Sequence, residues 1–262
     1  MTTGNKQVDK IKSPMIAGEN KGKLESEIIY DTDIQIKEIQ NRIWKALKRR
    51  YQYDSNLESG QNFLKNHVNS KIPLVILYVD LVGSTNLSMT LPVDKLVTII
   101  RAFTYEMSLA VYRYGGFVLK YVGDAVIAFF PSLSNKYVVC DRAVRCGISM
   151  ITIIKNGLNP ILNQYDYPDL SAKIGIDEGE NIIVQYGHDE NSSLDIISYC
   201  MSVSAKMTSL TKSNNITVGD DVYVRLHPEL RQKFVRVNYS AREWNYVSKR
   251  TGELYKLYTL KQ

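Results

Sequence analysis

Two aspartates stand at the ends of apolar runs, where a charged side chain is unusual. Asp80 closes the run 72–79, and Asp124 lies in the turn between the runs 117–122 and 125–130. These runs are rich in β-branched and aromatic residues, which predicts buried strands. Because burial of an unpaired carboxylate is costly, the two aspartates are poor core residues. If they meet in space, they form a site for hard divalent cations.

The segment between the runs predicts how Asp80 and Asp124 come together. Residues 91–114 repeat apolar side chains at helical spacing, and Pro92 lies near the start of this helix. A strand, a long helix and a second strand form a right-handed crossover, which leaves the two strands parallel. The third strand then folds back and runs antiparallel to both. If it lies beside the first strand, Asp124 lies next to Asp80.

The composition is that of a globular chain with one well-cored domain. The protein has 262 residues, 44% of them hydrophobic, and a net charge of +6. This length exceeds the commonest domain size, about 100–150 residues, by too little to require two domains. The charge favours anionic partners in general but does not establish nucleic-acid binding, and we expect none. No stretch reaches the roughly 18 consecutive apolar residues of a transmembrane segment.

Compartment is predicted from cysteine usage and from the N-terminus. The three cysteines, Cys140, Cys146 and Cys200, lack metal-ligand spacing, and one of them must lack a disulfide partner. This pattern is typical of a reducing compartment. The N-terminus has no signal-peptide core. We therefore expect a cytoplasmic protein.

The chain divides into three parts by composition and periodicity. Residues 1–30 are polar and aperiodic, which predicts disorder. Residues 31–70 are predicted to form a helical extension and connector, and residues 71–262 are predicted to form the main domain. Within this domain we expect further elements. They are a helix at 137–154, a loop at 156–169, a hairpin of 172–176 with 182–186 that turns at 177–180, a helix at 196–211, and short strands in the tail.

Around Asp80 and Asp124 the chain resembles a known family, the class III nucleotidyl cyclases. The segments 78–85 (YVDLVGST) and 120–126 (KYVGDAV) look like the family's two metal-carboxylate motifs, in its order and at its usual separation. The resemblance covers about residues 73–259. It implies an α+β fold, with a ferredoxin-like βαββαβ core and an extended, mostly antiparallel sheet, here preceded by the N-terminal helical extension. It also implies a head-to-tail homodimer with active sites at the interface.

The reaction of that family explains why these residue types are needed. The ribose 3′-hydroxyl of a nucleoside triphosphate attacks its own α-phosphate and pyrophosphate leaves, so the resemblance implies a phosphorus–oxygen lyase. Two divalent ions, Mg²⁺ or Mn²⁺, can activate the attacking oxygen and hold the leaving group. The resemblance implies that Asp80, Asp124 and the carbonyl of Leu81 bind these ions. It also implies that the turn after Leu81 binds the phosphates through the backbone N–H groups of Gly83, Ser84 and Thr85.

Two further matches concern the nucleotide base, which the second subunit of the dimer would read. Lys120 matches the family's adenine-reading lysine, and Asp195 matches the aspartate that accepts from the adenine amino group. A lysine donor and an acidic acceptor complement the adenine edge. The resemblance therefore favours ATP as substrate and cyclic AMP as product. GTP or a pyrimidine nucleotide remains an alternative.

Three positions depart from the family pattern. Ser202 and Lys206 stand where the family has an asparagine and an arginine, which orient the ribose and stabilise the transition state. Lysine keeps the positive charge but lacks the bidentate fork of arginine. Thr251 stands where a phosphate-binding lysine is expected, so Arg250 or Lys249 is the candidate replacement. A slow cyclase, a cyclase for another nucleotide and a nucleotide-binding regulatory module without turnover all remain open.

Overall fold

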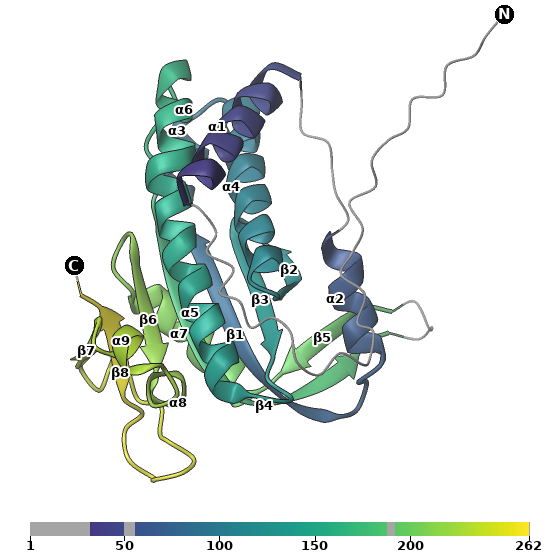
Figure 1. Ribbon diagram of the computed structural model, residues 1–262, viewed down its shortest axis with the longest axis vertical. Helices are drawn as coiled ribbons and strands as arrows, with labels where there is room; N and C mark the ends of the chain where they lie inside the picture. Colours follow the sequence, from purple (N-terminus) through teal and green to yellow (C-terminus); the bar gives the residue numbers. More distant parts are fainter. Residues whose placement is uncertain (1–31, 50–55, 188–191, 262) are drawn as a thin grey trace, which may run out of the picture.

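The computed structural model describes residues 32–49, 56–187 and 192–261, so the predicted disorder of residues 1–30 lies outside the described residues. In this part of the chain, eight strands form one mostly antiparallel sheet (Figure 1). They are β1 (Lys71–Leu81), β2 (Phe117–Val122), β3 (Ala125–Pro131), β4 (Ala172–Gln185), β5 (Leu194–Ile197), β6 (Asn215–Gly219), β7 (Phe234–Val237) and β8 (Leu257–Leu260). The order is β2-β3-β1-β4-β6-β8-β7, and β5 pairs with β4.

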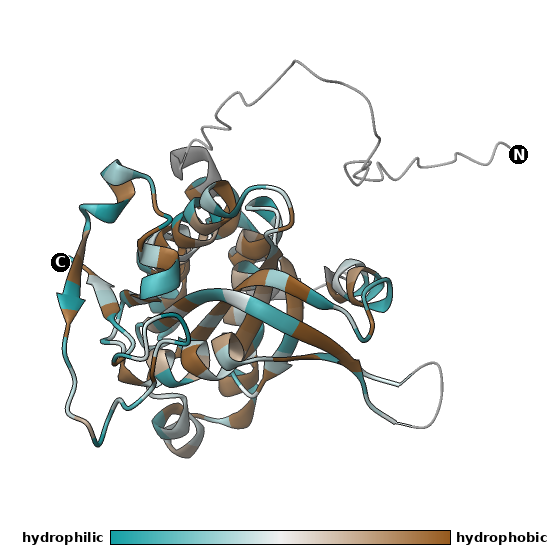
Figure 2. Ribbon diagram, turned by 90° about the horizontal axis from the view of Figure 1, so that it is seen from below, coloured by the Kyte–Doolittle hydropathy of each residue, from teal (hydrophilic) through white to brown (hydrophobic). Residues whose placement is uncertain are grey.

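Helices cover both faces of the sheet, and hydrophobic residues gather along the central strands and the helices beside them (Figure 2). The longer helices are α1 (Thr32–Arg49), α2 (Asn56–Lys65), α4 (Val93–Arg113), α5 (Lys136–Thr152) and α7 (Tyr199–Leu210). The shorter ones are α3 (Ser84–Thr90), α6 (Asn159–Leu162), α8 (Asp220–Tyr223), α9 (Pro228–Arg231), the π-helical turn η1 (Ile153–Leu158) and the 3₁₀ turn η2 (Asn163–Tyr165). None of the described helices is long and apolar enough to cross a membrane.

Strand β1 is buried on both faces, which explains its unbroken apolar sequence. Val75, Leu77 and Val79 point into the main core with α1, α4 and α5. Leu74 and Ile76 point into a second core with α2 and β5. Strand β3 lies between β1 and β2 and runs antiparallel to both. The strand predicted at 72–79 and the predicted arrangement of the three strands are confirmed.

The predicted hairpin at 172–186 is wrong. Strand β4 is a single strand of 14 residues, and β1 pairs with it without interruption from Lys71, opposite Ile182, to Leu81, opposite Ala172. The acidic run at 177–180, which we expected in a turn, lies inside this strand. The hairpin partner of β4 is β5 instead.

Distant partners keep the acidic run in the sheet. Glu178 is buried, and its two carboxylate oxygens lie 3.0 Å from Lys136 Nζ and 3.4 Å from Arg225 Nη1. Asp177 is also buried, which raises its pKa well above the usual value, and the Tyr255 hydroxyl donates to it at 2.7 Å. Because these partners come from α5, from the turn after α8 and from the segment before β8, the local sequence could not reveal them.

Two other predicted elements need correction. The helix expected at 196–211 begins at Tyr199, because Leu194 and Ile196 are buried at alternate positions of β5 and Ser198 caps the helix. The loop expected at 156–169 is mostly helical and contains the end of η1, α6 and η2. Its Gly157 lies against Ile39 of α1, where a Cβ atom would lie only 3.0 Å from the isoleucine side chain. This long-range contact favours helical packing over a loop.

Helix α1, which we predicted at this position, packs against the main core. Ile39 and Ile43 are fully buried there. Beside them, the Arg42 guanidinium donates to both carboxylate oxygens of Glu106 on α4, at 3.2 and 2.9 Å. Burial raises the pKa of Glu106, and Arg42 opposes that rise. The pair therefore fixes α1 to α4 at a carboxylate that has almost no contact with solvent.

We expect Arg42→Ala to lower the free energy of unfolding by about 3 kcal/mol, because it leaves the Glu106 carboxylate buried without its partner. Urea denaturation followed by circular dichroism measures this loss. Glu38→Ala is the control on the same helix. Glu38 is exposed and pairs with Arg42 and Arg113, so we expect a loss below about 1 kcal/mol. Equal losses in the two variants would contradict the anchoring role of Arg42.

Candidate active site

The structure brings Asp80 and Asp124 to the same end of the sheet. Asp80 is the second-last residue of β1, and Asp124 lies in the turn between β2 and β3. Val79 pairs with Val126, so the end of β1 meets the start of β3, as predicted. The turn is tight, and Gly123 adopts a positive φ of 63° that other residues rarely accept. The two carboxylates thus lie where two hydrogen-bonded strands meet, Asp80 on β1 and Asp124 in the turn that leads into β3.

The electrostatics of this acid pair fit a divalent cation. Partial burial raises the pKa of Asp80, the charge of Asp124 raises it further, and Lys173 across the strand pair lowers it. One carboxylate oxygen of Asp124 is buried and has no hydrogen-bond partner among the described residues. Two carboxylates that destabilise each other, with one oxygen unpaired, match the oxygen-donor set that Mg²⁺ prefers.

Further metal ligands must come from the backbone or from a substrate. In the described part of the chain, no group of three or more His, Cys, Asp or Glu side chains could hold a metal ion. The three cysteines are buried and form no disulfide. Leu81 follows Asp80 at the end of β1 and buries its side chain in the main core, so only its backbone is available. The metal-binding role expected for the Leu81 carbonyl stays a prediction.

The turn after β1 presents a helix N-terminus beside the acid pair. Gly83 has a positive φ of 75°, and α3 begins at Ser84, followed by the exposed Thr85. No side chain caps this end of α3, so its first N–H groups remain available for an anion. Val82 N donates to Ser171 O at 2.9 Å, which fixes the turn to the segment before β4.

A β-bulge positions Lys120. Val118 pairs with Ala128, but Lys120 pairs with Ile127, so β2 has one more residue than β3 at this point. Ile127 faces the second core, and the bulge turns Lys120 to the same face of the sheet. There its ammonium lies 2.5 Å from the carboxylate of Asp195 on β5. The structure therefore brings together the two residues that we expected to read the base.

Tyr78 and Met201 join this group, although the sequence did not single them out. The Tyr78 hydroxyl donates to Met201 Sδ at 3.1 Å. Burial, followed by the charge of Asp195, raises the pKa of Tyr78 to about 12, so the phenol stays neutral. Strand periodicity could have identified Tyr78, because it lies two residues before Asp80 and so on the same face of β1.

Ser202 and Lys206 lie one helical turn apart on α7. The helix approaches β4 closely at Gly175, where a Cβ atom would lie 2.6 Å from the Ser204 carbonyl oxygen. Ser202 is exposed, and its hydroxyl donates to the Ser198 carbonyl at 3.4 Å. Lys206 is half-buried. The two side chains therefore share one side of a helix that is held firmly to the sheet.

The two candidate phosphate-binding cations near the C-terminus have different surroundings. Arg250 is mostly exposed, and its guanidinium lies 3.2 Å from the carboxylate of Asp220. The Lys249 ammonium lies 5.1 Å from the ring centre of Tyr199, the first residue of α7. Lys249 is therefore closer to the helix of Ser202 and Lys206, whereas Arg250 already has an acidic partner.

Comparisons with known proteins identify relatives of this chain. A model of the family described as "Adenylate and Guanylate cyclase catalytic domain" matches residues 67–260. The chain is 25% identical over 163 residues to a cytidylate cyclase of Escherichia coli, covering 58% of this chain and 35% of that protein. It is 27% identical over 169 residues to a uridylate cyclase of Burkholderia cepacia, covering 63% and 71%. The chain thus spans about a third of the length of the first relative.

A solved structure shares the fold. The adenylyl cyclase CyaB from P. aeruginosa superposes with a TM-score of 0.62 at 21% sequence identity, covering 74% of this chain and 95% of that chain. The predicted α+β architecture with its extended antiparallel sheet is therefore confirmed.

We expect Asp124→Asn to weaken Mn²⁺ binding by at least about tenfold, because the variant loses a charged ligand at the acid pair. In metal-free buffer the same variant should unfold at a slightly higher temperature, because the repulsion that raises the pKa of Asp80 is gone. Thermal unfolding with and without Mn²⁺ measures both effects. Asp166→Asn, on an exposed turn, is the matched control. An unchanged Mn²⁺ response in Asp124→Asn would exclude the acid pair as a metal site.

Proposed function

The chain belongs to the adenylate and guanylate cyclase catalytic-domain family, and from this we propose that it cyclises a nucleoside triphosphate to a 3′,5′-cyclic nucleotide and pyrophosphate. The observation that carries the proposal is the acid pair, Asp80 and Asp124, which lies beside the uncapped N-terminus of α3. A cation-binding pair next to a phosphate-binding turn is what a metal-dependent reaction on a triphosphate requires.

Each group then has a role in the reaction. Asp80, Asp124 and the Leu81 carbonyl would hold two divalent ions, Mg²⁺ or Mn²⁺. When bound, such ions make the 3′-hydroxyl more acidic and neutralise charge on the leaving pyrophosphate. The N–H groups at the start of α3 bind the phosphates. From α7, the Lys206 ammonium stabilises the charge that develops on the α-phosphate.

The ion pair of Lys120 and Asp195 supports selection of an amino base. Adenine presents a ring nitrogen that accepts a hydrogen bond and an amino group that donates one, and cytosine presents the same pair. Guanine and uracil carry a carbonyl oxygen where these bases carry the amino group, which would leave Asp195 facing an acceptor. We therefore propose ATP as the first candidate. CTP is the second, favoured by the similarity to a cytidylate cyclase.

We further propose that the enzyme is a head-to-tail homodimer with sites across the interface. One chain would supply the acid pair, and the other would supply Lys120, Asp195 and α7. Tyr121 and Val122 support this arrangement, because these exposed apolar side chains lie between Lys120 and Asp124 on the same hairpin. Exposed apolar side chains grouped between polar functional residues are typical of an interaction surface.

Turnover with each of the four nucleoside triphosphates, Mg²⁺ or Mn²⁺ and mass detection of the product tests the proposed reaction. We expect a cyclic nucleotide from ATP or CTP and none in the Asp124→Asn variant. Absence of product from all four substrates would favour a regulatory nucleotide-binding module. Cyclic GMP or cyclic UMP as the main product would overturn the proposed role of Asp195.

Lys120→Gln extends this test to the base. We expect the variant to raise the KM for the preferred nucleotide and to reduce its preference over GTP by about tenfold, because a site built around a hydrogen bond discriminates strongly. Lys71→Gln, at the exposed start of β1, is the matched control. An unchanged preference in Lys120→Gln would remove Lys120 from base recognition.

Mixing two inactive variants tests the shared site. Asp80→Ala damages the metal half and Asp195→Ala the base half, so each should be nearly inactive alone. A mixed dimer has one doubly damaged site and one intact site. With random pairing about half of all dimers are mixed, so activity should recover to roughly a quarter of the parent.

Asp80→Ala mixed with Asp124→Ala is the control, because both changes lie in the same half and no intact site can form. Activity that stays absent in the first mixture, although mixed dimers are shown to form, would mean that the site lies within one chain.

A further inference from the structure

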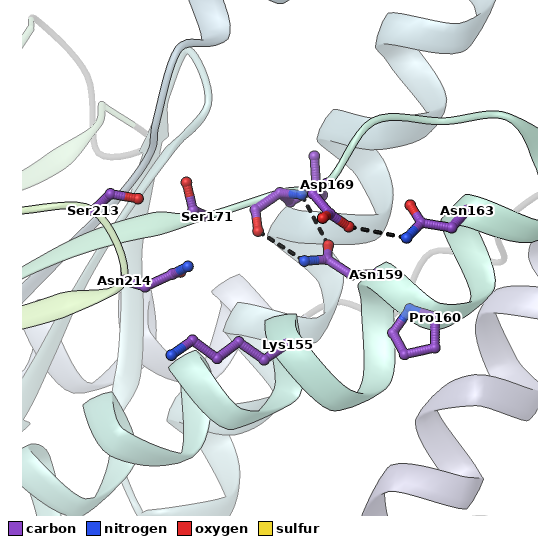
Figure 3. Close-up of a pocket in the computed structure, with 9 residues that line it drawn as sticks. Lys155, Asn159, Pro160, Asn163, Asp169, Ser171, Ser213 and Asn214 are labelled. Carbon is purple, nitrogen blue, oxygen red and sulfur yellow. Dashed lines mark hydrogen bonds between the residues drawn. The ribbon is translucent and has the colours of Figure 1, made fainter. Parts of the chain in front are cut away.

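A polar pocket of about 510 Å³ lies outside the candidate active site (Figure 3). It is bordered by η1 and α6 on one side, and by the segments that lead into β4 and β6 on the other. None of the residues that we assign to the cyclase reaction lines it. The lining residues that matter below are Lys155, Asn163, Asp169, Ser171, Ser213 and Asn214.

Hydrogen bonds from two asparagines to the backbone hold the pocket wall in place. The Asn159 amide donates to Leu170 O at 3.0 Å and accepts from Leu170 N at 2.9 Å. On the other side, Asn214 N donates to Ala172 O at 2.7 Å, and the Asn214 side-chain oxygen accepts from Ala172 N at 3.3 Å. The segment before β4 is therefore fixed from both sides, and the pocket is preformed.

Four donors at one end of this pocket remain available for a ligand. They are the Lys155 ammonium, the Asn214 side-chain NH₂ group and the hydroxyls of Ser171 and Ser213. The structure records no hydrogen bond or ion pair for these four groups within the described residues. Figure 3 shows them gathered at one end, whereas Asp169 lies toward the other end, where Asn163 donates to it at 3.0 Å. The pocket therefore has a cationic, donor-rich end and an acidic end.

We propose that this pocket binds a small phosphate ester that carries hydroxyl groups. A phosphate monoester offers three strong acceptor oxygens and negative charge, which match one ammonium and three neutral donors. The Asp169 carboxylate can accept from hydroxyl groups at the other end of the ligand. The volume lies within the usual range of small-molecule sites, about 300–1,000 Å³. Lys155 also lies in a π-helical turn, and such turns are frequent at functional sites.

The pocket shares a hydrogen bond with the candidate active site. Ser171 offers its hydroxyl to the pocket, and its carbonyl accepts from Val82 N at 2.9 Å. Val82 begins the turn that leads to Gly83 and α3. A ligand that binds the Ser171 hydroxyl therefore restricts the motion of the phosphate-binding turn. On the proposed function, which this step requires, we expect the occupied pocket to lower the KM for the nucleotide.

Ribose 5-phosphate, titrated calorimetrically into the full chain without divalent metal or nucleotide, tests the site itself. We expect it to bind, whereas ribose does not. Lys155→Gln should weaken binding by about tenfold, because a charge-assisted hydrogen bond is lost. The unfolding temperature of the Lys155→Gln variant should match that of the parent. Lys212→Gln, which removes an exposed charge next to Ser213 outside the pocket wall, should bind like the parent.

Equal affinity in Lys155→Gln and the parent, or equal binding of ribose, would overturn the site. Displacement of ribose 5-phosphate by a nucleoside triphosphate would place the phosphate in the active site and also overturn it. If the two sites are coupled, the nucleotide instead raises the affinity for ribose 5-phosphate. Ribose 5-phosphate then raises the affinity for the nucleotide by the same factor, because coupling between two binding sites is reciprocal. The calorimetric binding measurements need no turnover, so they test the pocket even if the protein proves inactive as a cyclase.

Discussion

The acid pair and the candidate groups on β5 and α7 take their positions from β1, because this strand is hydrogen-bonded along both edges and buried on both faces. Its pairing with β3 places Asp124 beside Asp80. Its pairing with β4 places the strand to which β5 and α7 attach, and these carry Asp195 and Lys206. A shift of one residue in either pairing would turn all side chains of the shifted strand to the opposite face. The chemistry therefore depends on register more than on any single contact.

The ion pair of Lys120 and Asp195 gives the base site a defined state before a nucleotide arrives. Both side chains are partly exposed, and ion pairs of this kind contribute little stability, typically about 0–1 kcal/mol. A base can therefore replace the pair at small cost if it offers both an acceptor and a donor. A base with the wrong group leaves a carboxylate without a partner in a partly buried place, which costs more. Discrimination then arises mainly from the penalty on the wrong base.

The sequence was sufficient to predict an element where the signal was local, and it was insufficient where the element depends on distant partners. The strand that carries Asp80 near its end and the Gly123-Asp124 turn have strong local patterns, and the structure contains both. The acidic run at 177–180 has the composition of a turn, and it stays in β4 because Lys136, Arg225 and Tyr255 reach it from elsewhere. The bulge that aims Lys120 is equally invisible in the sequence, because a bulge is defined only by the partner strand.

The folded body of this chain extends beyond the segment that matches the family. The match begins at residue 67, yet Ile39 and Ile43 of α1 are fully buried in the main core. Ile39 packs on Gly157, and the Gln40 side chain donates to Asn156 O at 2.9 Å, so α1 contacts the π-helical turn η1 directly. That turn also carries Lys155 of the polar pocket. The N-terminal helix is therefore part of the framework that shapes the pocket, because its packing fixes the turn from which Lys155 projects.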